Sequence, residues 1–265
     1  MTTQIHPSAH VDPKAQIGEG VEIGPLCVVG PDVILHDGVK LVSQVNIAGI
    51  THIGEGSILY PFVSLGHPPQ DFKHSGGKVR LIIGARNTFR ELVNVHPGTD
   101  AGRRDTIIGN DCYFMVGSHL AHEGHVGNNV VFSNGVQVGG CVTIGNNVII
   151  GGLSAVHQFT RIGDHAFIGG MACVTTDVIP YGSVVGNFAH LAGLNVIGLK
   201  RRGFDRQAIR DLRSAYRLLF ANEGTFKERL EDVSKLYANH EQVMDIVSFI
   251  QAKENRPICM PHTGL

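Results

Sequence analysis

The amino-acid sequence is poor in aromatic and charged residues. Among its 265 residues there is no tryptophan, aromatic side chains make up 6% and charged side chains 17%, and the net charge is −1. Nucleic-acid binding relies on basic side chains that neutralise phosphates, and this composition provides no overall basic surface. Because 43% of the residues are hydrophobic, we expect a folded protein that binds no nucleic acid rather than a disordered chain.

Long hydrophobic runs and closely paired cysteines are also missing. No stretch approaches the ~20 apolar residues of a membrane span, and the first residues, MTTQIHPSAH, lack the basic and apolar regions of a secretion signal. We therefore expect a cytoplasmic protein without a membrane span. The cysteines are odd in number and widely spaced, which predicts reduced thiols rather than a disulfide framework; they are Cys27, Cys112, Cys141, Cys173 and Cys259.

Glycine, in contrast, is abundant, with 34 residues, and part of it recurs with a regular period. An aliphatic residue or phenylalanine occupies every sixth position in three blocks, Ile5 to Leu65, Ile83 to Val95 and Ile108 to Val174, which together contain 26 such positions. In 13 of these hexads the next residue is glycine, as in Ile144-Gly145. Neither a helix nor an ordinary strand has a period of six, so the internal repeat determines the predicted fold.

A short strand, a tight corner and another short strand satisfy this period, and three hexads then close one triangular coil. The aliphatic side chains point into the prism, and glycine relieves crowding or allows unusual dihedral angles near the corners. Parallel strands of neighbouring coils lie ~4.8 Å apart, so the hexads build about nine coils. A β-sandwich would instead show a period of two and irregular loops, which the unbroken register excludes.

The six-residue period ends after Pro180, and a helical period replaces it. Asp205 can cap a first helix, Thr225 with Glu228 matches the capping box of a second, and a third is expected over residues 241–253. The sequence therefore predicts a mainly β protein, a parallel β-helix followed by a small C-terminal α-helical domain.

Two insertions, at residues 66–82 and 96–107, interrupt the repeat. Both follow hexads of the face that begins at Val11, so both loops project from the same corner of the prism. Loops on one corner of a rigid scaffold are typical of a binding or catalytic site. The predicted domains are a β-helix with these two loops over residues 1–190 and a helical domain over residues 191–265.

Polar residues gather at this corner in the predicted register. His122, Gly140 and Gln158 occupy equivalent positions of successive coils. An imidazole can remove a proton and a backbone amide can bind an oxyanion, so the pair suits acyl transfer. Further candidate contacts lie beside these positions or on the loops: Asp71, Lys73, His96, His119 and His157.

Simpler roles compete with the catalytic interpretation at some of these positions. His96 and His119 fit structural turns as well as substrate contacts. His125 is expected at the surface, since its hexad phase matches that of His119 rather than that of His122. Cys141 follows Gly140 but shows no sign of thiol activation, which argues against a nucleophile.

The segments GHPPQDFKHSGG, VHPGT, GSHLAHEGHVG, AVHQF and GNFAHLAGLNVIGLKRRGF, together with the helical tail, resemble the UDP-N-acetylglucosamine acyltransferases of the hexapeptide-repeat acyltransferase superfamily. The resemblance implies a left-handed parallel β-helix and a homotrimer, although general crossover chirality favours the right hand. It also implies transfer of an (R)-3-hydroxyacyl chain from acyl carrier protein to the 3-hydroxyl of UDP-N-acetylglucosamine, the first step of lipid A synthesis. The family uses no metal or other cofactor.

The resemblance also implies roles for single residues. His122, in SHLAHEG, matches the general base, Glu123 is the acidic residue beside it, and the amide of Gly140 would bind the thioester oxyanion. An imidazole, with an ordinary pKa of about 6.5, can accept a hydroxyl proton near neutrality. The matching substrate contacts are Asp71, Lys73, His119, His157 and Gln158, the acyl-length position Gly170, and the nucleotide-binding positions Asn195, Arg201 and Arg202.

A basic patch is expected at the start of the helical region. Seven basic residues and two acidic ones between Lys200 and Arg217 give a local charge of +5. A solvated helix face would account for this charge, but acyl carrier proteins are strongly acidic and a basic patch would steer one in. We favour docking for these seven residues: Lys200, Arg201, Arg202, Arg206, Arg210, Arg213 and Arg217.

Three positions depart from the family pattern. Glu123 stands where aspartate is common, Cys141 where relatives carry histidine, and Ile197 where they carry glutamate. These departures leave open whether the acceptor has a hydroxyl or an amine at sugar carbon 3.

Two further functions are alternatives. A γ-class carbonic anhydrase is also a trimeric β-helix with histidine ligands, but His122 differs in hexad phase from His119 and His125, and the ligand pair of that family, with four residues between, is absent here. A structural or ice-binding solenoid would show a uniform threonine face and no corner insertions.

Overall fold

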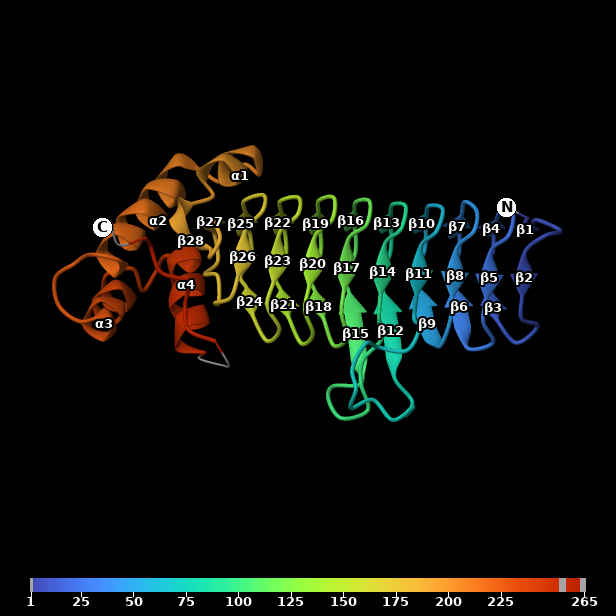
Figure 1. Cartoon of the computed structure of the whole chain (residues 1–265). Helices are drawn as coiled ribbons and strands as arrows, with labels where there is room; N and C mark the ends of the chain where they lie inside the picture. Colours follow the sequence, from blue (N-terminus) through green and yellow to red (C-terminus); the bar gives the residue numbers. More distant parts are fainter. Residues whose placement is uncertain (1, 253–255, 263–265) are drawn as a thin grey trace.

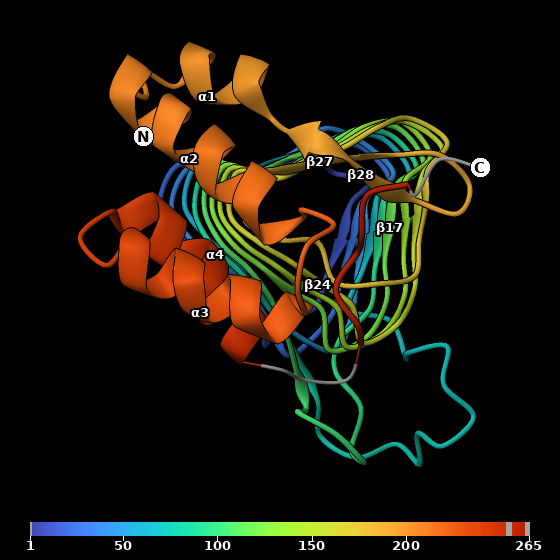
Figure 2. The ribbon, with the colours of Figure 1, turned by 90° about the vertical axis from the view of Figure 1, so that its left-hand side faces the viewer.

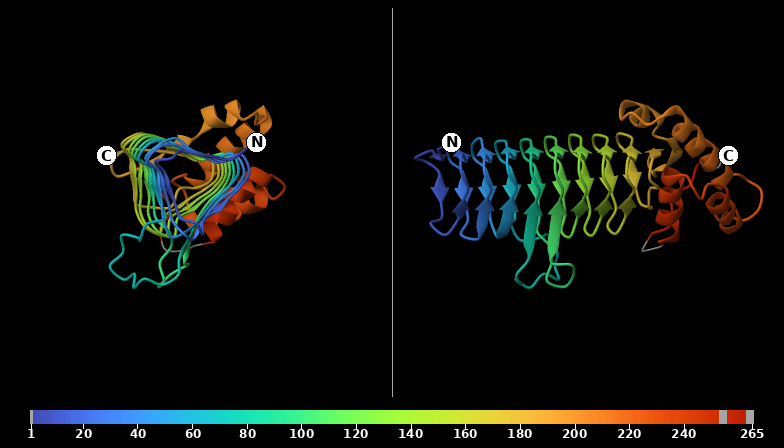
Figure 3. Two further views of the ribbon diagram at one scale, coloured as in Figure 1. Left: turned by 90° about the vertical axis from the view of Figure 1, so that its right-hand side faces the viewer. Right: turned by 180° about the vertical axis from the view of Figure 1, so that it is seen from behind.

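The computed structural model describes residues 2–252 and 256–262 and consists of a triangular prism of short strands with helices at its C-terminal end (Figure 1). Successive strands of the coil belong to three different sheets, seen end-on in Figure 3. Within the described residues, all strand pairs are parallel except β27 with β28.

The three faces are named sheets A, B and C. Sheet A contains β1 (Gln4–Ile5), β4 (Glu22–Ile23), β7 (Lys40–Leu41), β10 (Ile58–Leu59), β13 (Thr88–Phe89), β16 (Tyr113–Phe114), β19 (Val131–Phe132), β22 (Ile149–Ile150), β25 (Phe167–Ile168), β27 (Gly182–Val185) and β28 (His190–Leu194). Sheet B contains β2 (His10–Val11), β5 (Val28–Val29), β8 (Asn46–Ile47), β11 (Ser64–Leu65), β14 (Asn94–Val95), β17 (His119–Leu120), β20 (Gln137–Val138), β23 (Ala155–Val156) and β26 (Cys173–Val174). Sheet C contains β3 (Gln16–Ile17), β6 (Val33–Leu35), β9 (Ile50–Ile53), β12 (Arg80–Ile83), β15 (Asp105–Ile108), β18 (His125–Val126), β21 (Thr143–Ile144) and β24 (Arg161–Ile162).

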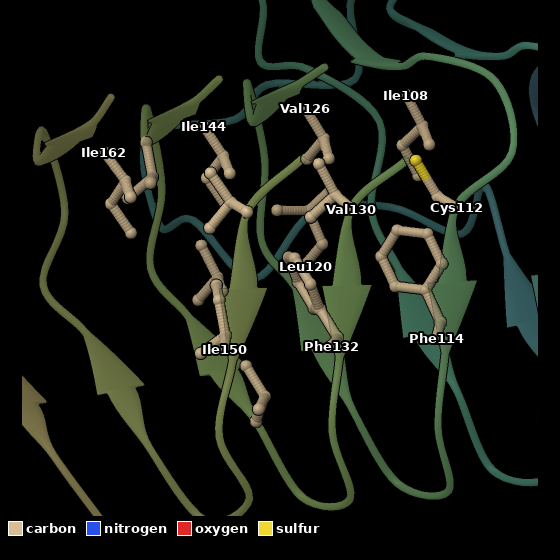
Figure 4. Packing of buried hydrophobic residues seen from close by; sticks show 14 of the residues in the cluster. Ile108, Cys112, Phe114, Leu120, Val126, Val130, Phe132, Ile144, Ile150 and Ile162 are labelled. Atoms are coloured by element: carbon tan, nitrogen blue, oxygen red, sulfur yellow. The ribbon is translucent and has the colours of Figure 1, made fainter. Parts of the chain in front are cut away.

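The repeated aliphatic positions form the core, as the six-residue period predicts. Leu120 pairs with Val138, for example, and both side chains are buried. Figure 4 shows such side chains stacked inside the prism, where Phe114 and Phe132 lie with ring centroids 4.7 Å apart. The Ile5 side chain remains 47% exposed because it lies in the first coil, which no earlier coil covers. Stacking therefore buries residues that a single coil leaves in water.

The glycines that follow the aliphatic residues relieve crowding. A Cβ atom on Gly24 would collide with the Val42 carbonyl of the next coil, and one on Gly54 with the backbone of Gly84. Among the 13 glycines of this kind, Gly66 alone has a positive φ. The sequence allowed two reasons for these glycines, crowding and unusual dihedral angles. Crowding between neighbouring coils is therefore the general reason.

The two loops leave the prism at the corner between sheets B and C, which we call the B–C corner (Figure 2). One connects β11 to β12 and the other connects β14 to β15. Their shared corner is confirmed, since Leu65 and Val95, the residues before the two loops, are paired in sheet B.

After the prism, the described part of the chain forms four helices: α1 (Val196–Arg201), α2 (Arg206–Leu219), α3 (Phe226–Leu236) and α4 (Glu241–Gln251). The Asp205 carboxylate accepts hydrogen bonds from the backbone at the start of α2, and Thr225 with Glu228 forms the predicted capping box of α3. The expected third helix is α4, although Lys253 lies outside the described residues. The short α1 and the strand pair β27 and β28 were not predicted, because α1 has only six residues and the strand pair lies beyond the last hexad, where the repeat no longer marks strands.

A buried ion pair joins the helices to the prism. Arg161 Nε donates to Asp177 Oδ2 at 2.8 Å, and its other nitrogens donate to the carbonyls of Phe249 and Ala252 at the end of α4. Arg161 thus supplies donors at the C-terminal end of α4, where helix carbonyls generally lack intrahelical partners. No described helix is long and apolar enough to cross a membrane, and all five cysteines are free, as expected.

Candidate active site

His122 lies at the B–C corner against the backbone of Gly140. A Cβ atom added to Gly140 would lie 2.5 Å from Cε1 and 2.6 Å from Nε2 of the imidazole. The ring therefore occupies the space that a side chain at position 140 would need. The Nδ1 atom of His122 is buried and has no hydrogen-bond partner in the structure.

The amide of Gly140 is free to bind a ligand. The two neighbouring amides are used in the coil, because Gly139 donates to Val156 and Cys141 donates to the carbonyl of His122 at 2.9 Å. No described residue accepts a hydrogen bond from the Gly140 amide itself. The structure thus brings together the imidazole and the free amide that the sequence predicts at this corner.

Glu123 lies beside His122 but its carboxylate points to other partners. It accepts hydrogen bonds from the amide and the hydroxyl of Thr99, on the second loop, and from the thiol of Cys141. A nitrogen of His122 and a carboxylate oxygen of Glu123 lie within 4.8 Å of each other. No hydrogen bond joins them among the described residues, so the Glu123 carboxylate lies close to the imidazole but does not hold the ring by a hydrogen bond.

Cys141 occupies the position of Glu123 in the next coil, and both residues have a left-handed backbone, with φ values of 59° and 60°. The thiol donates to Glu123 Oε2 at 2.9 Å. Burial, followed by this hydrogen bond, raises the pKa of Cys141 to about 12. A protonated thiol is a poor nucleophile, which agrees with the absence of an activation signal in the sequence.

His96 and His119 lie close to each other and to His122. Their ring centroids lie 5.1 Å apart in an edge-to-face arrangement, and His119 Nδ1 is 2.8 Å from Asn94 Oδ1. Burial, followed by the nearby His119 and His122, lowers the pKa of His96 to about 4. Burial also lowers the pKa of His119. Both rings are therefore neutral at neutral pH.

Asp71 and Lys73 lie on the first loop, which the second loop holds in place. Asp100 of the second loop accepts hydrogen bonds from the amides of Ser75 and Gly77, and from the Ser75 hydroxyl. His74 Nδ1 is 3.1 Å from Asp100 Oδ1. The donors of Ser75 hold the pKa of Asp100 well below its ordinary range. We call this set of contacts the Asp100 latch.

His157 and Gln158 lie at the corner one coil beyond Gly140 and are exposed. Arg256, from the segment after α4, reaches back to this point. Its Nη2 is 2.6 Å from His157 Nδ1, and its Nε donates to the Gln158 carbonyl at 3.2 Å. The corner thus gains a cation from a distant part of the chain.

The remaining predicted contacts lie elsewhere in the chain. Asn195 caps α1 and donates from Nδ2 to the carbonyl of His165. With Arg201 and Arg202 it lines a cavity of about 620 Å³ between α1 and sheet A, which we call the α1 pocket. Gly170 follows β25 at the corner between sheets A and B, where an added Cβ would meet nothing closer than 3.4 Å.

The structure therefore gathers His122, Glu123 and Gly140 at the B–C corner. Helix α1, which lines the α1 pocket together with sheet A, lies across the prism from that corner (Figure 2). Sequence reasoning missed Thr99, the Asp100 latch and Arg256. Thr99 falls in the quoted segment VHPGT, so its position was accessible, but its contact with Glu123 depends on the fold of the loop. Nothing in the repeat indicates the contacts of Asp100 or Arg256.

Comparison with known proteins agrees with this geometry. A family model described as bacterial transferase hexapeptide (six repeats) matches residues 14–49, and one described as UDP N-acetylglucosamine O-acyltransferase, domain 2, matches residues 177–259. The acyl-(acyl-carrier-protein):UDP-N-acetylglucosamine O-acyltransferase of Caulobacter vibrioides is 56% identical, over 97% of this chain and 98% of that protein. The protein of the same name from Azorhizobium caulinodans is 51% identical, over 98% of this chain and 96% of its own length.

The fold matches in three dimensions as well. A crystal structure of UDP-N-acetylglucosamine acyltransferase superimposes with a TM-score of 0.94 and 36% identity, and the match covers 98% of this chain and 100% of that one. Superposition preserves hand, so the prism has the hand of that structure. The acyltransferase function inferred from the sequence is thus shared with relatives matched over nearly the whole chain, and this chain belongs to the UDP-N-acetylglucosamine O-acyltransferase family.

Proposed function

We propose that the protein transfers an (R)-3-hydroxyacyl chain from acyl carrier protein to the 3-hydroxyl of UDP-N-acetylglucosamine, with His122 as general base. The observation that carries the assignment of roles is the contact of the His122 ring with Gly140, whose amide has no acceptor in the described chain. A base and an oxyanion donor on adjacent coils can act on one thioester carbonyl.

In the proposed reaction, His122 accepts the proton of the sugar hydroxyl while the hydroxyl oxygen attacks the thioester carbonyl. The Gly140 amide donates a hydrogen bond to the resulting oxyanion. Collapse of the tetrahedral intermediate breaks the carbon–sulfur bond, and the imidazolium returns its proton to the departing thiolate. The Glu123 carboxylate, within 4.8 Å of a ring nitrogen, stabilises the imidazolium by its charge, whereas the neutral His96 and His119 add no competing positive charge.

The active protein is proposed to be a homotrimer. The B–C corner lies opposite sheet A, which lines the α1 pocket together with α1 (Figure 2), so we infer that one nucleotide sugar does not contact both within a single chain. A cyclic assembly can place the corner of one chain beside the pocket of its neighbour. Arg201 and Arg202 then bind the nucleotide phosphates, for which the guanidinium fork is suited. Their side chains have no ion-pair partner among the described residues, so they are available.

Acyl carrier protein is proposed to dock on the basic patch of α1 and α2. None of its seven basic side chains forms an ion pair with a described acidic residue within the chain, and Arg210 is bound to the neutral Gln207. The uncompensated charge supports attraction of an acidic partner. Carrier-protein-dependent synthesis and five free cysteines are consistent with the cytoplasmic location that we propose.

The test is a mass-spectrometric assay of the purified protein with UDP-N-acetylglucosamine and (R)-3-hydroxyacyl carrier proteins of several chain lengths. The expected product is the 3-O-acylated nucleotide sugar, formed at a much lower rate by His122→Ala. A parallel reaction with the 3-amino analogue of the acceptor tests the alternative that Cys141 and Ile197 leave open. If neither acceptor is acylated, the proposed function is wrong, and preference for the amine would reassign the acceptor.

A further inference from the structure

Three side chains with metal-binding atoms converge at the B–C corner. A ring nitrogen of His122, a carboxylate oxygen of Glu123 and the sulfur of Cys141 all lie within 4.8 Å of one another. Nitrogen, oxygen and sulfur ligands of these kinds bind Zn²⁺ at ~2.0–2.3 Å, which places ligand atoms of a tetrahedral site roughly 3.5 Å apart. The three side chains thus need only a small adjustment to hold one ion.

The hydrogen bonding of the cluster leaves the relevant atoms available. Thr99 occupies Oε1 of Glu123 by its amide and hydroxyl, so Oε2 faces Cys141. The sulfur of Cys141 lies 2.9 Å from this oxygen and donates its thiol proton to it. The His122 ring also has a nitrogen without a partner, since its Nδ1 is buried and makes no hydrogen bond with a described residue. A metal ion that replaces the thiol proton can be coordinated by both the sulfur of Cys141 and a ring nitrogen of His122.

Charge and access also fit a divalent cation. One thiolate and one carboxylate neutralise a dipositive ion, and the imidazole binds as a neutral ligand, so no net charge is buried. Glu123 is buried while His122 and Cys141 are partly exposed, which leaves the fourth position of a tetrahedral site open to solvent. Soft thiolate together with imidazole favours zinc over magnesium or calcium.

We propose that His122, Glu123 and Cys141 form an inhibitory binding site for Zn²⁺. Binding converts the thiol to a zinc thiolate and releases one proton to solvent. A neutral imidazole has one nitrogen lone pair, and the metal takes it while the other nitrogen carries hydrogen. His122 can then no longer accept the hydroxyl proton. The inhibitory consequence rests on the proposed function, whereas the binding site itself does not.

Binding is tested without activity by titrating the full-length protein with Co²⁺, which shares these ligands and shows an absorption band when a thiolate is coordinated. The expected result is one Co²⁺ per chain with a thiolate band, which Zn²⁺ displaces. Cys141→Ser keeps a donor for Glu123 but removes the soft ligand, so the band is lost. Cys173→Ser is the matched control, since Cys173 is also partly exposed but lies in sheet B, and it retains the band. Absence of the band, or an unchanged band in Cys141→Ser, overturns the site.

Inhibition is tested by measuring acyl transfer against Zn²⁺, with each variant compared with its own metal-free rate. We expect wild type and Cys173→Ser to lose activity and to recover it with a chelator, and Cys141→Ser to need at least ~10-fold more Zn²⁺. Equal sensitivity of the two variants contradicts inhibition through this site. If the metal-free protein transfers no acyl group to either acceptor, the proposed function fails, and the cobalt titration still decides whether the metal site exists.

Discussion

The B–C corner and the α1 pocket differ in how they are built. At the corner, His122, Glu123, Gly140 and Cys141 come from two adjacent coils, so the repeat itself spaces them, and the loops add Thr99 over Glu123. In the pocket, Asn195 lies at the N-terminal end of the short helix α1 and the two arginines at its C-terminal end, and the helix is placed against sheet A. The B–C corner therefore holds reactive groups at a fixed spacing, whereas the α1 pocket is a cavity lined by positively charged side chains. We expect substitutions in the two places to change different kinetic constants.

Removal of the base should have the largest effect. We expect His122→Ala to lower kcat by ~10²–10⁴-fold, the usual contribution of a general base, with little change in KM for the nucleotide sugar. Steady-state kinetics with acyl carrier protein at saturation measure both constants. His36→Ala, an exposed histidine at another corner, is the matched control and should keep the wild-type kcat. A change confined to KM would place His122 in binding rather than chemistry.

Removal of a pocket arginine should act mainly on binding. Charged hydrogen bonds are worth ~1.5–3 kcal/mol, so we expect Arg202→Ala to raise KM for UDP-N-acetylglucosamine by roughly 10–100-fold. Lys227→Ala removes an exposed cation from α3 and should leave this KM unchanged. If both substitutions have the same effect, the loss reflects overall charge and the assigned role of the α1 pocket is wrong.

Mixed assemblies test whether the corner and the pocket cooperate between chains. Co-expression of His122→Ala with Arg202→Ala in equal amounts leaves about a quarter of the interfaces with an intact corner facing an intact pocket, if chains mix at random in a cyclic trimer. We expect the purified mixture to recover about that fraction of wild-type activity when UDP-N-acetylglucosamine is present below its KM. Activity no higher than the mean of the two variants would mean that each chain works alone.

The Asp100 latch should have a smaller effect, because it acts on the corner through a loop. Asp100→Ala removes the acceptor for Ser75 and Gly77, and loss of ~1.4 kcal/mol of positioning corresponds to a ~10-fold lower kcat/KM. The control is Asp32→Ala, an exposed aspartate far along the prism. Faster proteolysis within the loops of Asp100→Ala, with an unchanged melting temperature, would identify local loosening. Unchanged kcat/KM would show that the latch does not position the site.

The smallest expected effect is the pH dependence of stability. Burial lowers the pKa of folded His96 to about 4, below the ordinary value of about 6.5 in an unfolded chain. The unfolded state then binds more protons between these values, so stability is lost as the pH falls from about 6.5 to about 4. We expect His96→Asn to reduce the difference in melting temperature between pH 7 and pH 5 by a few degrees, roughly. An unchanged difference would mean that other groups control acid stability.

Much of the site was predictable from the sequence because the coil has a constant length. Gly140, for example, follows His122 by 18 residues, the length of one coil. The repeat period alone therefore predicts that the two residues are in contact. The bonds of Glu123 to Thr99, and of Arg256 to Gln158, were not predictable in the same way. They depend on the paths of loops and on the return of the C-terminal segment, which no repeat describes.

The sequence by itself determined the prism, the corner with the loops and the stack that holds His122 and Gly140, because each follows from local spacing repeated along the chain. Only the tertiary structure decided that Glu123 accepts hydrogen bonds from Thr99 of the second loop rather than from the imidazole. It alone also placed the α1 pocket across the prism from the base. These features depend on contacts between segments distant in sequence, whose partners are selected by packing and by the satisfaction of buried polar groups.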